Sequence, residues 1–400
     1  MAIENTILLR WPGAQAAHLP LLRAANVETL VLPQGNAEFS EAASRAGMRT
    51  IPGSELPPVV TDGLWPGVRG GPSRRAREAE VASASSEPWV DSNGYLVAFH
   101  RVLRPDRAVL LAYEANEKAG VKPDVDTPFG TVELALVEAR VAGGNFVMDL
   151  PARFRERLLA ADPKAVEAWQ SLGKTALWLK RNSSLFGHPV MPQITALVEP
   201  GIATREIANL LHRRGASPLL KNASLAVRVD KGMLALVAVG LKEVPAECFA
   251  SAEAGATLVL DRPAPASAKL IRQEADRSFY SLGAGKIVAY NRRIADPSEF
   301  AMDVIDLITH KRRAARLWNA SAAIPLATAG GHPGEALLHI VNYGSPATDE
   351  IQAHIQGHFS RAMLLTPEKT PVQLRAVRRG SSTEVFIPSL RRLAVVRFSN

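Results

Sequence analysis

Short apolar runs alternate with amphipathic stretches through the first 150 residues. Alternation of this kind is typical of βα units and a parallel sheet. The pattern predicts strands at Ile7–Trp11, Thr29–Pro33, Arg49–Pro52, Gly67–Arg69, Ala108–Glu114 and Asn145–Leu150. It predicts helices at His18–Ala25, Ala37–Ala46, Tyr95–Leu103 and Val132–Ala142, then at Ala152–Ala161 and Pro163–Arg181, the last with Asp162 as its N-cap.

The hydrophobic pattern changes twice further along the chain. Strands at Ile194–Val198, Leu234–Val239 and Thr257–Asp261 alternate with helices at Thr204–Arg214 and Pro245–Ala254, which predicts a small doubly wound, flavodoxin-like unit. From Gly334 the pattern has period two, with short strands between turns, which predicts an all-β sandwich. The sequence therefore predicts three domains: a barrel-like β/α domain (1–185), a flavodoxin-like α/β domain (190–330) and a β-sandwich (334–400).

A chain of 400 residues is long for one hydrophobic core, which agrees with several domains. With 47% hydrophobic and 22% charged residues, the composition is that of a folded globular protein. The net charge is +8, but residues 311–400 carry 12 Lys/Arg against 5 Asp/Glu, so nearly all of it belongs to this last stretch of the chain. Because no aromatic residues interleave with these arginines, we expect a solvated basic face rather than a nucleic-acid site.

Membrane insertion and export signals are not indicated. The longest apolar run, Met233–Leu241, is less than half of the ~20 residues that a membrane-spanning helix needs. The start of the chain carries Glu4 and Asn5 where a signal peptide has basic residues, so as given the chain is expected to be cytoplasmic or to have lost an export signal. The single cysteine, Cys248, excludes an internal disulfide and does not indicate a compartment.

Three stretches, Leu338–Tyr343, Leu236–Asp261 and Gly283–Val288, together resemble parts of the β-galactosidase type of glycoside hydrolase. Leu338–Tyr343 matches the hydrophobic-His-hydrophobic-Val-Asn-Tyr strand that opens the C-terminal sandwich of that family. Leu236–Asp261 has the layout of its glutamine-amidotransferase-like trimerisation domain, and Gly283–Val288 is similar to a Gly-x-Gly-Lys-Val-Val hairpin near the end of that domain. The resemblance covers residues 190–400 by module and the first half only by layout.

The resemblance implies a TIM-type barrel, a carbohydrate partner, a mechanism with two carboxylates and the option of a homo-oligomer, with no cofactor. Two features depart from the family. Six strands are found where a complete barrel has eight, and no predicted strand ends in the Asn-Glu pair that carries the family's acid/base.

Two predicted barrel strands end in a carboxylate, Glu114 and Asp149. Active sites of such barrels lie at the carboxyl ends of the strands. Glycoside hydrolysis needs two carboxyl groups, ~5–5.5 Å apart for retention or ~6.5–9.5 Å for inversion of configuration. Glu114 and Asp149 are therefore the candidate catalytic pair. The alternative is that both cap the helices that follow.

Further residues are candidates for substrate binding. Trp11, Trp65 and Trp89 follow or end strands, where an indole could stack on a sugar ring or be buried in the core. Tyr113 and Asn116 flank Glu114, and Asp91 and Asn93 belong to an Asp-Ser-Asn-Gly segment that could instead cap the next helix.

Other chemistry is disfavoured. Cys248 lies within a predicted helix without the glycine-flanked elbow of a nucleophile, and the nine histidines show no metal-ligand spacing. Gly283–Lys286 lacks the full phosphate-loop spacing. The sequence thus predicts a glycoside-hydrolase-like protein. The alternative is a non-catalytic carbohydrate-binding or scaffold protein of the same architecture.

Overall fold

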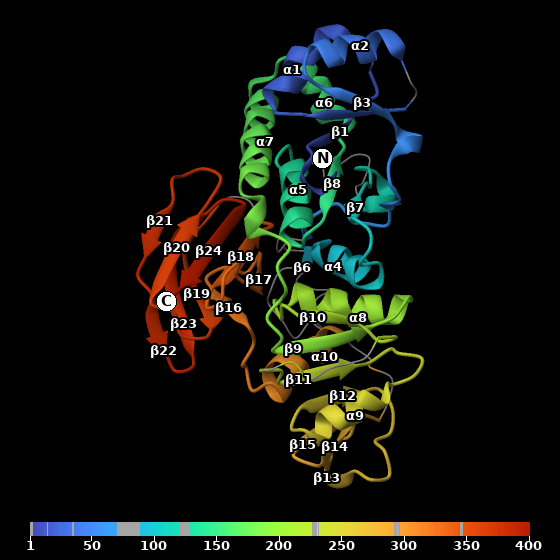
Figure 1. Ribbon diagram of the computed structural model, residues 1–400, viewed down its shortest axis with the longest axis vertical. Coiled ribbons are helices and arrows are strands. Elements are labelled where there is room, and N and C mark those ends of the chain that lie inside the picture. Colours follow the sequence, from blue (N-terminus) through green and yellow to red (C-terminus); the bar gives the residue numbers. More distant parts are fainter. Residues whose placement is uncertain are drawn as a thin grey trace, which may run out of the picture.

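Three parts make up the molecule: the N-terminal part, a middle α/β part and the C-terminal β part (Figure 1). The computed structural model describes residues 3–13, 15–33, 36–69, 89–120, 128–225, 230, 232–291, 294, 297–344 and 347–400.

Six parallel strands form the N-terminal sheet, in the order β3-β2-β1-β8-β7-β4. They are β1 (Leu8–Arg10), β2 (Thr29–Leu32), β3 (Arg49–Pro52), β4 (Val59–Val60), β7 (Leu110–Leu111) and β8 (Asn145–Met148). The first strand, β1, pairs with the last, β8, as in a barrel, and the other neighbours follow one another along the chain. Within the described residues no ladder joins β3 to β4. The sheet is therefore a six-stranded β/α barrel that is open at one seam.

One predicted barrel strand is wrong. Gly67–Arg69 is β5, which pairs antiparallel with β6 (Trp89–Asp91) outside the barrel sheet. The barrel strand is instead β4, two residues long directly after Pro57 and Pro58, and two residues are too few to produce a hydrophobic period. The long segment after Arg69, which interrupts the predicted rhythm, lies outside the described residues.

The helices of the N-terminal part lie close to their predicted positions. They are α1 (Leu19–Ala24), α2 (Ala37–Arg45), α4 (Gly94–Leu103), α5 (Thr131–Val141), α6 (Ala152–Leu159) and α7 (Pro163–Arg181), with short helical turns η1 (Ile3–Asn5), η2 (Ala16–His18), η3 (Gly53–Glu55), η4 (Glu117–Ala119) and η5 (Ser183–Leu185). The predicted cap of α7 is confirmed, since the Asp162 carboxylate accepts a hydrogen bond from the Ala165 amide at 3.0 Å and Pro163 begins the helix.

The middle part is a seven-stranded sheet of order β10-β9-β11-β12-β15-β14-β13. Its strands are β9 (Ile194–Val198), β10 (Leu219–Asn222), β11 (Ala235–Ala238), β12 (Thr257–Leu260), β13 (Lys269–Gln273), β14 (Arg277–Leu282) and β15 (Gly285–Tyr290). Its helices are α8 (Ile202–Arg213), α9 (Ala246–Glu253) and α10 (Pro297–Asp303). The π-helical turn η6 (Val304–Ile308) continues α10. The first four strands are parallel in the flavodoxin-like order 2-1-3-4. β11 is buried throughout, as its uninterrupted apolar run predicts.

The C-terminal part is a sandwich of two antiparallel sheets, β16-β19-β23-β22 and β17-β18-β24-β20-β21. The strands are β16 (Ala315–Trp318), β17 (Ala323–Ala329), β18 (Ala336–Asn342), β19 (Thr348–Gln356), β20 (Arg361–Leu365), β21 (Val372–Leu374), β22 (Val377–Arg379), β23 (Ser382–Leu390) and β24 (Leu393–Ser399). Two of these strands precede Gly334, so the sandwich begins earlier than the sequence indicates. The apolar and small residues of β17 do not alternate clearly with polar ones, so the sequence pattern does not predict this strand.

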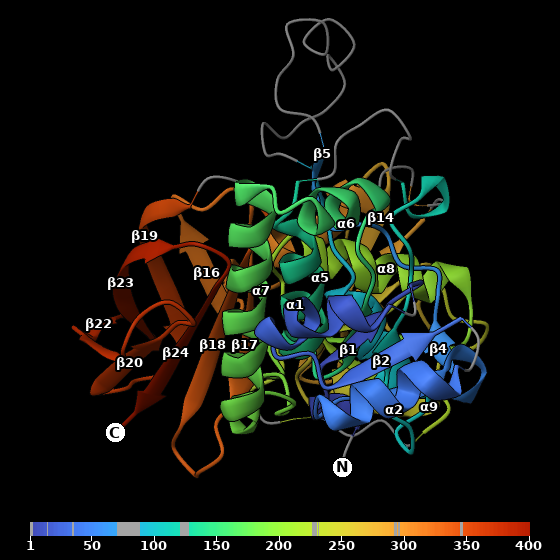
Figure 2. The ribbon, with the colours of Figure 1, turned by 90° about the horizontal axis from the view of Figure 1, so that it is seen from above.

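Helix α7 stands between the sandwich and the N-terminal strands (Figure 2). One continuous hydrophobic core includes Trp169 of α7, Phe146 of the barrel, and Leu337 and Val395 from the sandwich face. The sandwich therefore shares a core with the barrel rather than hanging from a linker.

The contact between α7 and α1 generates a test of this packing. A Cβ at Gly173 would lie 2.5 Å from Cα of Ala25, whereas a Cβ at Gly53 would meet nothing closer than 3.7 Å. We expect Gly173→Ala to destabilise the fold by about 1–3 kcal/mol through overpacking, although alanine favours a helix. Urea unfolding measures this, with Gly53→Ala as the tolerated control. Equal stability of the two variants would contradict the close approach.

Candidate functional site

Charged side chains from three neighbouring barrel strands meet at the carboxyl edge of the sheet. Arg10 is the last residue of β1, Asp149 follows β8, and Glu114 lies three residues after β7. Because β8 lies between β1 and β7, Asp149 is placed between the other two. This is the edge at which barrel enzymes carry their active sites.

The surroundings of Glu114 are polar. Its side chain is 60% exposed; Oε1 lies 3.7 Å from Nη1 of Arg10, and Oε2 accepts a hydrogen bond from Nδ2 of Asn116 at 3.1 Å. Asn116 is itself fixed, since its Oδ1 accepts from the Lys118 amide at 3.0 Å at the start of η4. Glu114 is thus an exposed carboxylate oriented by a cation and an amide.

Asp149 has the opposite environment. Burial raises the pKa of its carboxyl to about 6, and the nearby negative charge of Glu114 adds to this increase. The cations Arg10 and Arg155 and the Ala115 amide lower the same pKa without offsetting the burial. The influence of Glu114 on Asp149 indicates that the two carboxyl groups are close neighbours. One site thus holds a buried carboxyl with a raised pKa beside an exposed carboxyl, and different environments of this kind can separate an acid from a base.

Trp11 lies next to this pair but is only 1% exposed. Its ring meets the edge of His18, with centroids 5.5 Å apart and planes at 84°. Its Nε1 is buried and finds no hydrogen-bond partner among the described residues. In this conformation Trp11 forms the wall behind the strand end, and its face is not open for stacking.

Three other predicted binding residues form a buried network below the rim. The side chain of Asn93 bonds both backbone groups of Leu64, its Nδ2 also donating to the Tyr113 hydroxyl at 3.0 Å. The Nε1 of Trp65 donates to the Thr131 hydroxyl at 3.0 Å, and its ring packs on the edge of Tyr113. Because these polar groups form hydrogen bonds within the protein, we assign Trp65, Asn93 and Tyr113 to supporting the site and not to contacting a sugar. Asn93 is the N-cap residue of α4 without a side-chain cap bond.

The centre of this network is Glu138, which sequence reasoning missed. It is 1% exposed on α5, and four groups donate to its carboxylate: the Asn93 amide (2.8 Å), Asn93 Nδ2 (2.6 Å), the Tyr113 hydroxyl (3.3 Å) and the Tyr343 hydroxyl (3.0 Å). Burial outweighs these bonds and raises the pKa of Glu138 to about 7. An acid within an otherwise apolar helical run was the available signal.

Asp91 and Trp89 join the barrel to the middle part. An oxygen of Asp91 lies 3.5 Å from Nη2 of Arg213 on α8, and both side chains are nearly inaccessible. The Arg213 guanidinium also lies over the Trp89 ring at 4.0 Å, and Trp89 Nε1 donates to Asp91 at 3.2 Å. Trp89 keeps 42% of its surface exposed, the largest exposure of the three predicted tryptophans.

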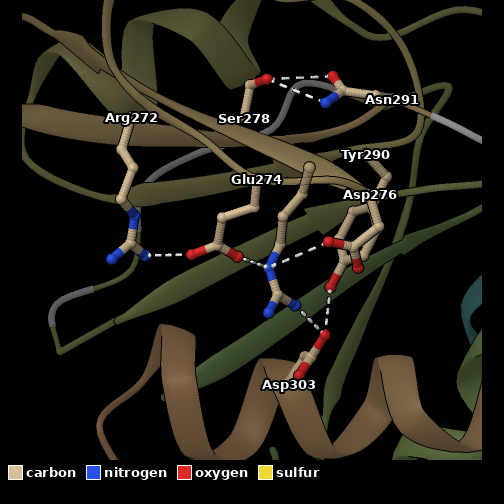
Figure 3. Close-up of polar contacts among 8 residues, drawn as sticks. Arg272, Glu274, Asp276, Ser278, Tyr290, Asn291 and Asp303 are labelled. Atoms are coloured by element: carbon tan, nitrogen blue, oxygen red, sulfur yellow. Dashed lines mark hydrogen bonds and ion pairs between the residues drawn. The ribbon is translucent and has the colours of Figure 1, made fainter.

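A second dense group of charges lies in the middle part (Figure 3). Arg277 donates to Glu274 at 2.8 Å and is paired with Asp303 of α10, which also accepts from the Tyr290 hydroxyl at 3.1 Å. Arg272 pairs with the same Glu274 at 2.8 Å. Every member bonds to another member of the group, so we interpret it as a clamp between the β14–β15 hairpin and α10.

Two features are absent from the described part of the chain. No cluster of three or more His, Cys, Asp or Glu side chains is arranged to hold a metal ion. None of its helices is long and apolar enough to cross a membrane.

Comparison with solved structures identifies the fold. The chain is similar to the β-galactosidase from Bacillus circulans sp. alkalophilus (TM-score 0.55, 9% identity, 100% of both chains covered). It is also similar to Gan42B, a GH42 β-galactosidase from G. stearothermophilus (0.53, 10% identity, 99% and 98% covered), and to α-L-fucosidase isoenzyme 2 from Paenibacillus thiaminolyticus (0.50, 9% identity, 98% and 77% covered). No family model and no curated protein matches. The chain thus has a β-galactosidase-like glycoside hydrolase fold.

The Glu138 network generates a paired test. Tyr343→Phe removes the shorter hydroxyl bond to a buried carboxylate and should destabilise the protein by about 1.5–3 kcal/mol. Tyr113→Phe removes the longer hydroxyl bond and should destabilise the protein less than Tyr343→Phe does. Urea unfolding of both variants compares them. A neutral Tyr343→Phe would contradict the role of Glu138 in holding the sandwich.

The raised pKa of Asp149 predicts a pH dependence of stability. Folding raises this pKa from 3.8 to about 6, so the folded state favours the protonated form of Asp149. The stability that this contributes is fully present below pH 4 and is lost as the pH rises through 6. We expect Asp149→Asn to flatten the fall in Tm between pH 4 and 7, leaving the part due to Glu138. The exposed Glu117 provides the control, Glu117→Gln. An unchanged pH profile in Asp149→Asn would show that the carboxyl is not buried.

Proposed function

We propose that this protein is a glycoside hydrolase in which Asp149 and Glu114 form the catalytic pair. The observation that carries the proposal is the proximity of a buried, proton-retaining carboxyl and an exposed carboxylate on adjacent strands at the active edge of the barrel. Glycosidases need one group of each kind. The fold is that of proteins that act on sugars, and fold alone does not assign the activity.

The environments assign different roles to the two carboxyl groups. Asp149, with its pKa near 6, would donate a proton to the departing glycosidic oxygen. Glu114 would act on the anomeric carbon, directly or through a water molecule. Arg10 and Asn116 hold one oxygen each of Glu114, and so they would orient it toward the sugar.

Direct contact with the substrate is proposed for few of the predicted binding residues. Asn116 lies at the rim beside Glu114 and has polar atoms within reach of a sugar hydroxyl. Trp89 offers an exposed ring, although Arg213 covers part of it. The proposed substrate is a carbohydrate, and no metal or cofactor is required by this mechanism.

We infer that the middle part, which resembles a glutamine-amidotransferase-like domain, carries no glutaminase chemistry. Cys248 is fully buried in the middle of α9, and burial raises the pKa of its thiol to about 12. A thiol in this state forms almost no thiolate at neutral pH.

The catalytic assignment is tested on pairs of glycosides that differ only in the leaving group, an alkyl or a nitrophenyl. Asp149→Asn should lower kcat/KM by about 10²–10⁴-fold on the alkyl glycoside and by less on the nitrophenyl one, which needs little protonation. Glu114→Gln should lower both equally. In the parent, the rate should fall as the pH rises through about 6.

The control is Glu167→Gln, which removes an exposed acid of α7 outside the loops at the carboxyl edge and should leave the rate unchanged. If the parent binds sugars but hydrolyses none, or if both amide variants keep the parent's activity, the pair is structural. The non-catalytic carbohydrate-binding alternative then replaces this proposal.

A further inference from the structure

A cavity of about 570 Å³ lies at the junction of the three parts, away from the carboxylate pair. Asn5, Val109 and Gly144, which precede β1, β7 and β8, line it, so it lies at the amino ends of the barrel strands. Glu114 and Asp149 follow the opposite ends of β7 and β8. The cavity is thus separated from the proposed active site by the length of the sheet.

All three parts contribute to the wall of the cavity. The barrel supplies α4 and the end of α5, the middle part supplies Ala208, His212 and Leu219, and the sandwich supplies Leu326. Its volume falls within the ~300–1,000 Å³ of small-molecule sites, which commonly lie between domains. A ligand seated here would contact all three parts at once.

The charge of the wall is unbalanced. Apart from histidines, the charged side chains that line the cavity are three arginines (Arg101, Arg107 and Arg140) and a single acid, Asp106. Arg107 pairs with that acid at 3.5 Å. Arg101 donates to the carbonyls of Ala142 and Gly187, at 3.1 and 3.3 Å, and no carboxylate of the described chain neutralises it. Apart from Arg140, the described wall thus sets two arginines, Arg101 and Arg107, against one acid, Asp106.

Most of the remaining wall is apolar or aromatic, with Asn5, Ser183 and two histidines as its other polar side chains. Tyr95, Phe186 and Val102 line it, and these side chains suit the body of a sugar ring or another compact organic group. The volume is much larger than a bare inorganic anion requires. The wall therefore fits a molecule with one anionic group and a ring-sized body.

We propose that this cavity binds a small organic anion, carrying a phosphate or a carboxylate on a ring-sized body, as a site distinct from the carboxylate pair. The anionic group lies toward Arg107 and Arg101, and the body packs on Tyr95 and Phe186. Because the wall spans three parts, occupancy stabilises their packing. The site does not depend on the glycosidase proposal.

Calorimetric titration of the full chain tests the proposal with glucose 6-phosphate and glucuronate, and with glucose as the neutral probe. We expect at least one of the two anions to bind and to raise Tm, and glucose to bind at least 10-fold more weakly. Phosphate and carboxylate are distinguished by which anion binds better.

Charge variants locate the site. Arg107→Glu should weaken anion binding at least about 10-fold, whereas Arg104→Glu, an exposed arginine of the same loop outside the cavity wall, should not. Asp106→Asn removes the only acid of the wall and should strengthen binding. All three positions are exposed, so the variants are expected to fold, and Tm of each unliganded variant checks this. Three outcomes would overturn the proposal. Neither anion binds, the anions bind no better than glucose, or Arg107→Glu and Arg104→Glu weaken anion binding equally.

Discussion

The docking of the sandwich on the barrel depends on two carboxylates buried on one helix, α5. Glu138 accepts hydrogen bonds from Asn93 and Tyr113 within the barrel and from Tyr343 of the sandwich. Glu133, which is 2% exposed, accepts from Thr175 of α7 at 2.5 Å and is paired with Arg391 of the sandwich. A buried carboxylate that loses one partner is costly, so each can be satisfied only when the sandwich is docked.

This constraint explains why so few polar groups near the rim are available to a ligand. Tyr113 follows the barrel strand β7, where a barrel enzyme would use it on its substrate, but here Tyr113 and Asn93 both satisfy Glu138. The polar groups that remain at the rim are Arg10, Glu114, Asn116 and Asp149. The open seam between β3 and β4 removes further strand ends from the rim, which concentrates any chemistry on the β1–β8–β7 side.

The local pattern predicted most of the helices and the longer strands, because their apolar periods are set by neighbours in the sequence. It also placed Glu114 and Asp149 at strand ends, since that requires only the strand boundaries. It missed β4, which is too short to show a period, and β17, whose alternation is weak. It could not find Glu138 or the buried pairing of Arg213 with Asp91, because both depend on partners from distant parts of the chain.

The two ends of the barrel strands differ in a way that separates binding from chemistry. At the carboxyl ends, Arg10 and Arg155 partly neutralise the acidic pair, and burial raises the pKa of Asp149 while Glu114 stays exposed. At the amino ends, arginines outnumber acids around a cavity that the other two parts complete. Asp149 can exchange a proton near pH 6, whereas the arginines at the amino ends stay charged at any such pH. A ligand at the amino ends could therefore influence the carboxylate pair only by changing how the three parts pack on the shared barrel.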